Sequence, residues 1–236
     1  MKRIFRAIVP VQLREKVKEF QEYQGYQKLR RQEGHTYQCF DATKSIFVHI
    51  PKAGGISIIK SLYGEQAGGF GHPTYMRFLK LFGKKQFDAY YKFTFVRNPW
   101  DRLHSAYGFL KKGGMNHQDK RFSEEVMSQV DTFEDFVMTW LTPERVNAWV
   151  HFIPQYKYIT NAKGEIIVDF VGRFENFETD FNVISKHIGV NQTLIHLNKT
   201  KDKKIFNFRE VYTTEMIEKV EVLYEKDIDL FNYKFL

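Results

Sequence analysis

The sequence predicts an α/β fold in which a central parallel sheet is flanked by helices. Strand-like and helix-like segments alternate along the chain, as they do where helices connect parallel strands. Two strand-like segments, residues 45–50 and 92–96, are almost continuously apolar, which is typical of strands buried on both faces. Each runs into a polar turn and then a helix, so both turns are expected at the sheet edge where such folds bind ligands.

The chain is predicted to form a single domain over residues 1–236, because no Pro-rich or Gly/Ser-rich linker divides it. Residues 1–31 are expected to be a helical extension, and residues 45–236 the core. Leu13, Val17 and Phe20 form an apolar helical stripe among basic residues. We favour packing of this stripe on the domain, with contact to a membrane surface or to a partner as the alternative.

The first turn, residues 51–57, reads P-K-A-G-G-I-S and has the composition of an anion site. Gly54 and Gly55 allow close approach of the backbone, and the first amides of the following helix have no partner within it. Such amides attract phosphate or sulfate, and Lys52 adds a positive charge. Ser57 can donate a further hydrogen bond. The alternative is a tight strand-to-helix turn with a solvated lysine.

The second turn, within residues 91–107, specifies another helix start. Asn98 is a suitable N-cap, Pro99 suits the first helical position, and Asp101 is placed to close a capping box. Trp100, Leu103, Tyr107 and Leu110 share one apolar face, and Asn98, Asp101, Arg102 and Ser105 the other. Arg97 can grip a phosphate through two parallel hydrogen bonds, or it can pair structurally with Asp101.

Later segments continue the alternation of strands and helices. Residues 169–174 are predicted as a strand, followed by a helix marked by Phe177, Phe181, Ile184 and Ile188 and closed by Gly189. Thr213 is expected to cap a late helix whose inward face carries Met216, Val220 and Leu223.

Together the two turns resemble the membrane-type carbohydrate sulfotransferases, which include the uronyl 2-O- and chondroitin 4-O-sulfotransferases. Residues 51–57 match that family's P-K-x-G-G-x-S loop, and residues 96–107 match V-R-N-P-W-D-R-L-x-S-x-Y at every fixed position. Blocks at 151–155, 169–176, 196–200 and 224–233 also resemble later family segments. The resemblance implies a P-loop-NTPase-like sulfotransferase fold and the donor 3′-phosphoadenosine 5′-phosphosulfate (PAPS), which becomes 3′-phosphoadenosine 5′-phosphate (PAP).

The resemblance also implies residue roles. Lys52 would stabilise charge on the leaving oxygen, and His72, in a glycine-rich loop, would accept the proton of the acceptor hydroxyl. Most loop histidines have no such role, so His72 rests on its position in the family pattern. His151 is the reserve base and a candidate contact to the acceptor. Arg173 is a second candidate contact to the acceptor, unless it pairs with Glu175 or another carboxylate. The predicted cofactor-binding residues are Lys52, Ala53, Gly54, Gly55, Ile56, Ser57, Arg97, Ser105 and Lys199. Lys199 belongs to a basic loop, and the alternative for this loop is a solvated run of charges without a ligand.

Two other functions fit parts of the sequence. A P-loop kinase would place its lysine after the glycines with a magnesium-binding Ser or Thr beside it, and Gly55-Ile56 supplies neither. A non-enzymatic module that binds glycans or nucleic acid would use the net charge of +8, with steep salt dependence. Most aromatic residues follow core periodicities, so we expect no nucleic-acid partner.

The expected acceptor is a carbohydrate hydroxyl, on an acidic or lipid-linked glycan among others, and residues 63–73 and 111–128 are expected to shape its choice. The histidines are scattered, so no metal is expected. No segment approaches the roughly 20 apolar residues of a membrane span, which predicts a cytoplasmic enzyme with peripheral membrane contact as the remaining alternative. No motif indicates an oligomeric state.

Overall fold

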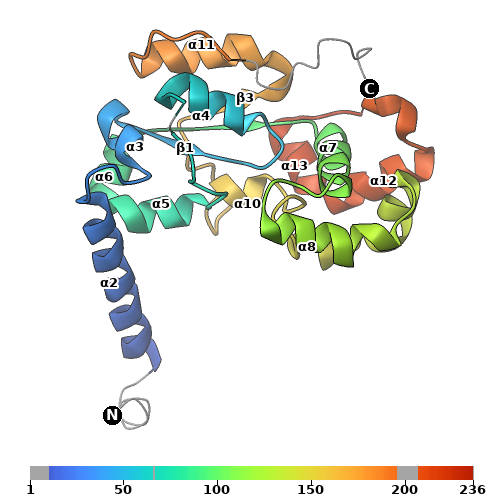
Figure 1. The fold of residues 1–236 in the computed structure, drawn as a ribbon, viewed down its shortest axis with the longest axis horizontal. Helices are drawn as coiled ribbons and strands as arrows, with labels where there is room; N and C mark the ends of the chain where they lie inside the picture. The colour runs from blue at the N-terminus through green and yellow to red at the C-terminus, as the bar shows by residue number, and fades with distance from the viewer. Residues whose placement is uncertain (1–10, 66, 196–206, 236) are drawn as a thin grey trace.

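The α/β prediction is confirmed by the computed structural model, which describes residues 11–65, 67–195 and 207–235 (Figure 1). Three parallel strands, β1 (Ser45–Val48), β2 (Tyr91–Val96) and β3 (Phe170–Arg173), form a sheet in the order β1-β2-β3. The register pairs Phe47 with Phe93 and Phe93 with Phe170. A closer likeness of this small sheet to P-loop proteins stays a prediction.

Helices surround the sheet, and Figure 1 shows α4 and α11 on one side of it and α5 and α10 on the other. The α-helices are α2 (Val11–Arg30), α3 (Gln38–Thr43), α4 (Gly55–Tyr63), α5 (Tyr75–Phe82), α6 (Lys84–Ala89), α7 (Pro99–Lys111), α8 (His117–Glu125), α9 (Phe133–Asp135), α10 (Tyr156–Ile159), α11 (Phe177–His187), α12 (Thr214–Leu223) and α13 (Glu225–Phe231). A π-helical turn, η2 (Phe136–Trp140), and short 3-10 turns, η1 (Met127–Gln129), η3 (Arg145–Asn147), η4 (Phe174–Asn176) and η5 (Phe208–Val211), complete the regular structure.

Aromatic side chains fill the sheet core. Phe47 stacks on Phe93 across β1 and β2 with ring centroids 5.2 Å apart, and both are almost fully buried. A Cβ at Gly172 of β3 would lie 2.8 Å from the Phe95 ring, so glycine is what lets this ring pack against the backbone. The buried Thr94 hydroxyl donates to Val48 O at 2.7 Å, which satisfies it inside the core.

The predicted start of α7 is confirmed except for its capping box. The Asn98 side chain accepts from Trp100 N and Asp101 N, and Pro99 occupies the first helical position. The Asp101 carboxylate does not return to the cap, because Glu175 takes the Asn98 amide at 2.6 Å. Asp101 binds Arg97 instead.

Arg102, which the periodicity of α7 groups with Asn98, Asp101 and Ser105, is buried. This side chain is only 1% exposed, and its guanidinium donates to four backbone carbonyl oxygens. A periodicity argument places a charged residue on the solvent side, whereas here other loops cover that side of the helix.

Two later predictions are confirmed. Helix α11 follows β3, with Phe181 and Ile184 buried and Gly189 just beyond its end at φ 69°. Thr213 caps α12 by accepting from Met216 N at 3.3 Å.

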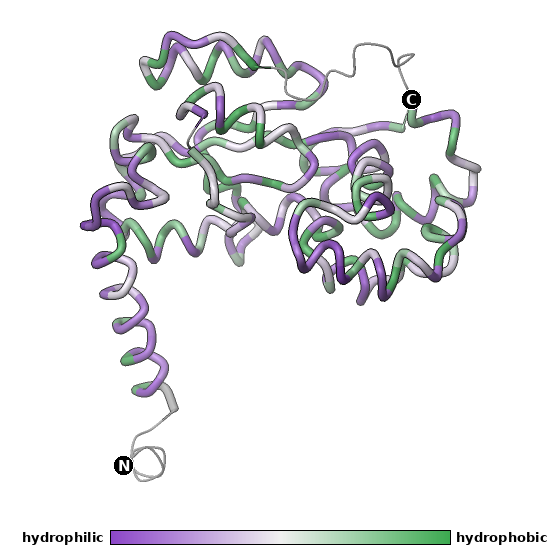
Figure 2. Tube along the Cα trace, viewed as in Figure 1, coloured by the Kyte–Doolittle hydropathy of each residue, from purple (hydrophilic) through white to green (hydrophobic). Residues whose placement is uncertain are grey.

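Helix α2 extends away from the rest of the chain in Figure 1, and Figure 2 shows that it is mostly hydrophilic. The preference for packing of its apolar stripe is wrong, because Leu13 and Phe20 are 51% and 61% exposed and Val17 is also exposed. The helix is attached at its other end, where Arg30 pairs with Asp41 and Gln27 donates to Leu81 O. Within the described ranges, no helix is long and apolar enough to cross a bilayer.

Candidate functional site

A cavity of about 500 Å³ lies where the turns after β1 and β2 meet. The predicted anion loop, the start of α7 and the His72 loop all reach it, which confirms that the two motifs lie at one sheet edge. Its lining consists of His49, Lys52, Gly54, Gly55, Ile56, Ser57, His72, Arg97, Ser105, Phe109, Met115, His151, Phe174 and Phe177.

The loop after β1 has the backbone of an anion cradle. Lys52 has a positive φ of 67°, which is costly for a residue with a Cβ, and Gly54 follows at φ 80°. The first backbone bond onto α4 runs from Ile58 N to Gly54 O, so the earlier helix amides lack an intrahelical partner. Such amides at a helix start attract anions.

Both glycines of this loop are required by their neighbours as well. A Cβ on Gly54 would lie 2.6 Å from the Phe177 ring, and one on Gly55 would lie 2.0 Å from the His49 ring. His49 is buried, and burial lowers the pKa of its imidazole well below the usual value. His49 therefore packs against the loop, and its ring also lines the cavity.

The ammonium group of Lys52 lies 3.7 Å from the centroid of the Phe109 ring, a cation–π contact within the cavity wall. Burial, together with the positive charge of Arg97, lowers the pKa of Lys52 to about 8, while the charge of Asp119 acts in the opposite direction. A desolvated cation next to a second cation is stabilised by a bound anion.

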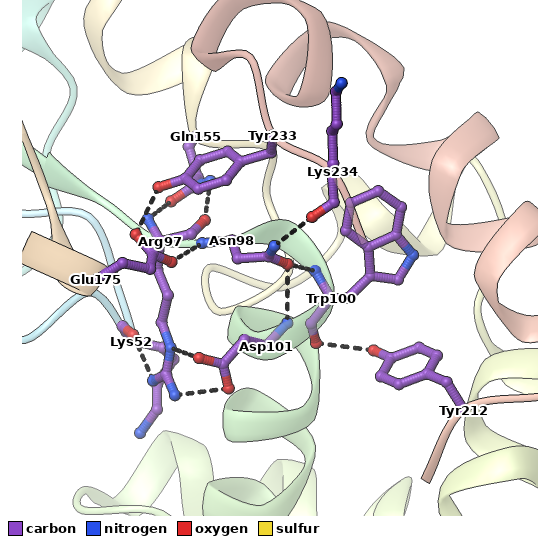
Figure 3. A network of polar contacts seen from close by, with 10 residues as sticks. All are labelled: Lys52, Arg97, Asn98, Trp100, Asp101, Gln155, Glu175, Tyr212, Tyr233 and Lys234. Atoms are coloured by element: carbon purple, nitrogen blue, oxygen red, sulfur yellow. Dashed lines mark hydrogen bonds and ion pairs between the residues drawn. The ribbon is translucent and has the colours of Figure 1, made fainter. Parts of the chain in front are cut away.

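Arg97 combines both interpretations made from the sequence. Its Nε and Nη2 each donate to Asp101 at 2.8 Å, and Nη1 donates to Lys52 O at 3.1 Å (Figure 3). Its guanidinium also stacks on Phe174 at 4.2 Å. Because a guanidinium carries five N–H bonds, two remain after these three contacts, one on each Nη atom. Arg97 can therefore hold the Lys52 loop and still bind an oxyanion.

The backbone of Arg97 is fixed from behind by Gln155. Arg97 N donates to Gln155 Oε1 at 2.9 Å, and Gln155 Nε2 donates to Arg97 O at 2.8 Å (Figure 3). The buried Asp227 in turn accepts Gln155 N at 2.7 Å. Glu175 similarly holds Asn98 N and accepts from the Tyr233 hydroxyl. The start of α7 is thus anchored by the later family-like blocks.

His72 lies in the cavity wall with a defined orientation. Its Nδ1 is 3.1 Å from His49 O, and since a carbonyl can only accept, Nδ1 carries the proton. Nε2 is then the nitrogen with a free lone pair. Burial lowers the pKa of His72 below its usual value of 6.5, which keeps the imidazole neutral near pH 7 and able to accept a proton.

His151 lies near His72, with ring centroids 5.9 Å apart, and it too lines the cavity. Its Nε2 is 3.0 Å from Asp119 Oδ1. Burial lowers the pKa of His151 to about 4. The structure thus brings both candidate bases to one wall.

Some of the other predicted site residues line the cavity and others do not. Ser57 and Ser105 line the cavity together with Gly54, Gly55 and Ile56, while Ala53 is buried behind the loop. Lys199 lies outside the described residues. Arg173 is not among the cavity-lining residues: its guanidinium donates to Phe231 O and stacks on Tyr233 at 4.8 Å. These contacts favour a structural role, with a backbone carbonyl rather than Glu175 as the partner.

Sequence reasoning missed the apolar part of the lining and the carboxylate behind His151. Phe109, Met115, Phe174 and Phe177 line the cavity, and Asp119 lies next to it. Phe174 lies within the recognised block 169–176 and Phe177 directly follows it, which is a signal for their position. Met115 and Asp119 lie in the stretch 111–128, which is expected to shape the choice of acceptor but carries no motif that singles them out.

Comparisons with known proteins agree with this geometry. A sulfotransferase family model matches residues 71–234, a segment that contains His72, Arg97 and His151 but begins after the Lys52 loop. No solved structure gives a significant match to the chain.

Three relatives illustrate the range of similarity. An uncharacterized protein of Archaeoglobus fulgidus is 34% identical over 131 residues, which is 55% of this chain and 91% of that protein. Carbohydrate sulfotransferase 11 of Rattus norvegicus is 29% identical over 170 residues, covering 61% of this chain and 47% of the rat protein. Carbohydrate sulfotransferase 14 of Homo sapiens is 31% identical over 109 residues, covering 40% and 28%. The matched part of this chain thus spans most of the archaeal protein, about half of the rat protein and less than a third of the human protein. The motifs, the site they form and the match over residues 71–234 lead to one conclusion: the chain is an enzyme of the sulfotransferase family.

Proposed function

We propose that this protein transfers a sulfuryl group from PAPS to a hydroxyl of a carbohydrate acceptor and releases PAP. The observation that carries the proposal is the meeting of Lys52, the free amides of α4 and the Arg97 guanidinium in one cavity. The named relatives that are carbohydrate sulfotransferases support the acceptor class. The absence of a metal requirement and a cytoplasmic location remain parts of this proposal.

The residues present fit a donor with two separate anionic groups. The amides that open α4, with Lys52 and Ser57, would hold the 5′-phosphosulfate, and the two remaining N–H groups of Arg97, with Ser105, would hold the 3′-phosphate. The donor supplies an activated sulfuryl group. Lys52 would stabilise the charge that develops on the leaving phosphate, which would favour the transition state over the ground state.

His72 is the proposed base. Its Nδ1–H is committed to His49 O, which orients the imidazole and leaves Nε2 to take the proton of the attacking hydroxyl. Because its pKa is lowered, the neutral form that accepts protons predominates at pH 7.

Arg97→Lys keeps the positive charge but removes the planar fork, so it tests the 3′-phosphate contact. We expect calorimetry to show PAP affinity reduced by at least about tenfold, with a much smaller change for AMP, which lacks that phosphate. Arg121→Lys is the matched control, since Arg121 also pairs with a carboxylate four residues on but is exposed. Equal losses for PAP and AMP would contradict the clamp, and preference of the wild type for ADP or ATP with Mg²⁺ would favour a kinase.

His72→Gln removes the base and preserves a polar side chain. We expect PAP formation from PAPS, with unsulfated glycans such as chondroitin as probe acceptors, to fall by about 10²-fold or more. PAP affinity should stay within about threefold, since the donor contacts remain. His187→Gln, at the far end of α11 and stacked on Tyr91, is the control. Wild-type turnover in His72→Gln would remove this residue from the mechanism.

Lys52→Met tests whether the cation is held in place at a cost to stability. Burial lowers the pKa of Lys52 to about 8 in the folded protein. Below that pH the folded protein therefore carries the full free-energy cost of burying the charged form. We expect the variant to be more stable at pH 7 by roughly 0.5–2 kcal/mol in urea unfolding, while PAP affinity falls. The stability difference should shrink above pH 8, where folded wild-type protein loses this proton.

The same titration predicts that PAP affinity of the wild type declines as the pH rises through about 8, and that Lys52→Met lacks this decline. If Lys52→Met were less stable than the wild type at pH 7, and if its PAP affinity declined with pH as that of the wild type does, the inference that Lys52 is desolvated would be contradicted.

A further inference from the structure

Asp119 is a buried carboxylate with no role in the proposed chemistry. It is only 2% exposed and lies in the first turn of α8, behind the cavity wall. Its Oδ2 accepts from Asn116 Nδ2 at 2.8 Å and from Met115 N at 3.3 Å, and its Oδ1 is 3.0 Å from His151 Nε2. A single side chain therefore joins a loop to a histidine 32 positions further along the chain.

The loop before α8 is built around this carboxylate. Gly114 has a φ of 68°, and a Cβ there would lie 2.1 Å from Asp119 Cβ, so the loop could not pass so closely with another residue. Met115 follows, 73% exposed, and it lines the cavity. Loss of the Asp119 contacts would allow the loop that carries Met115, and with it this part of the cavity wall, to move.

His151 is the second cavity-lining residue that Asp119 contacts. An ionised carboxylate only accepts hydrogen bonds, so the contact with Oδ1 places the proton of a neutral His151 on Nε2. Nδ1 then carries a lone pair, is buried, and has no hydrogen-bond partner among the described residues. A buried polar atom without a partner is costly, and it indicates a partner that is not part of the chain.

We propose that Asp119 is a positioning residue: it fixes His151 as the Nε2–H tautomer and anchors the Met115 loop, so that Nδ1 of His151 is kept for a hydroxyl of the acceptor. This inference rests on the proposed sulfotransfer, in which His72 and His151 share one wall. The hydrogen bonds of Asp119 reach His151, Met115 and Asn116, which places its action on the acceptor side, while on the donor side its negative charge raises the pKa of Lys52.

Asp119→Asn tests this because an amide cannot satisfy both sets of partners. If its oxygen faces His151, its NH₂ group opposes the donors Met115 N and Asn116 Nδ2, and the loop loosens. If its NH₂ group faces His151, Nε2 must accept and the imidazole switches to the Nδ1–H tautomer. Nitrogen-15 spectra of the imidazoles of the full chain, with His151→Gln identifying the signal, report the tautomer, and amide exchange at Met115 reports the loop.

We expect the wild type to show the Nε2–H tautomer at pH 7. Asp119→Asn should show either the other tautomer or Met115 exchange faster by at least about tenfold. Asn116→Ala removes a loop contact of Asp119 and the N-cap of α8 but not the contact with His151, so it should speed exchange and leave the tautomer unchanged. Asp135→Asn is the matched control, since Asp135 also occupies the third position of a helix but binds only its own cap residue, Thr132. An Nδ1–H tautomer in the wild type, or no change in tautomer or exchange in Asp119→Asn, would overturn the proposal.

A kinetic measurement links the positioning to the acceptor. With PAPS and unsulfated chondroitin as the probe acceptor, Asp119→Asn should raise the acceptor KM by at least about tenfold, with PAP affinity within about threefold of the wild type. An unchanged KM in a variant with the altered spectrum would separate His151 from the acceptor. A wild type that binds no PAP would instead contradict the proposed function, whatever the spectrum of His151.

Discussion

The buried guanidinium of Arg102 is the interaction on which the rest of the site depends. A buried charge is tolerated only where hydrogen bonds replace its hydration, and here Pro51 O, His151 O, Phe152 O and Ile153 O surround it at 2.7 to 3.4 Å. Pro51 directly precedes Lys52, and His151 lines the same cavity. One side chain of α7 therefore sets the separation between the donor loop and the acceptor wall.

Asp227 extends this support to the second motif. It is fully buried, and burial raises the pKa of its carboxyl group while the nearby Arg102 opposes that change. It accepts the amides of Gln155 and Tyr156, and Gln155 holds both backbone groups of Arg97. The cavity-lining Arg97 is thus one end of a buried polar network. Such networks help to specify one geometry, although within the described residues Arg102 Nε and His151 Nδ1 have no hydrogen-bond partner.

The site itself concentrates positive charge that the free protein neutralises only in part. Asp101 accepts two hydrogen bonds from Arg97, whereas Lys52 lies over an aromatic ring. A strained φ at Lys52 and a lowered pKa at the same residue are both costs that a bound anion can offset. This arrangement is typical of a binding site whose stability is sacrificed for function.

Local signals predicted much of this protein. Continuous apolar runs gave the first two strands, Asn98 and Thr213 gave their helix starts, and the two turns gave the cation and the amides of the cavity. Long-range contacts were not predictable in this way. Nothing near Arg102 in the sequence indicates that it is buried, because its partners at 51 and 151–153 are brought there by the fold. Asp119 contacts its own loop at 115 and 116, but its partner His151 is 32 positions away. The α2 stripe misled for the same reason, since its periodicity is helical but none of the described elements covers it.

A crystal structure of the protein with PAP would test the central claim most directly. The account predicts the 5′-phosphate on the amides that open α4, close to Lys52, and the 3′-phosphate on the two free N–H groups of Arg97, with the Arg97–Asp101 pair intact. PAP bound away from this cavity, or a 3′-phosphate that displaces Asp101 or does not touch Arg97, would contradict it.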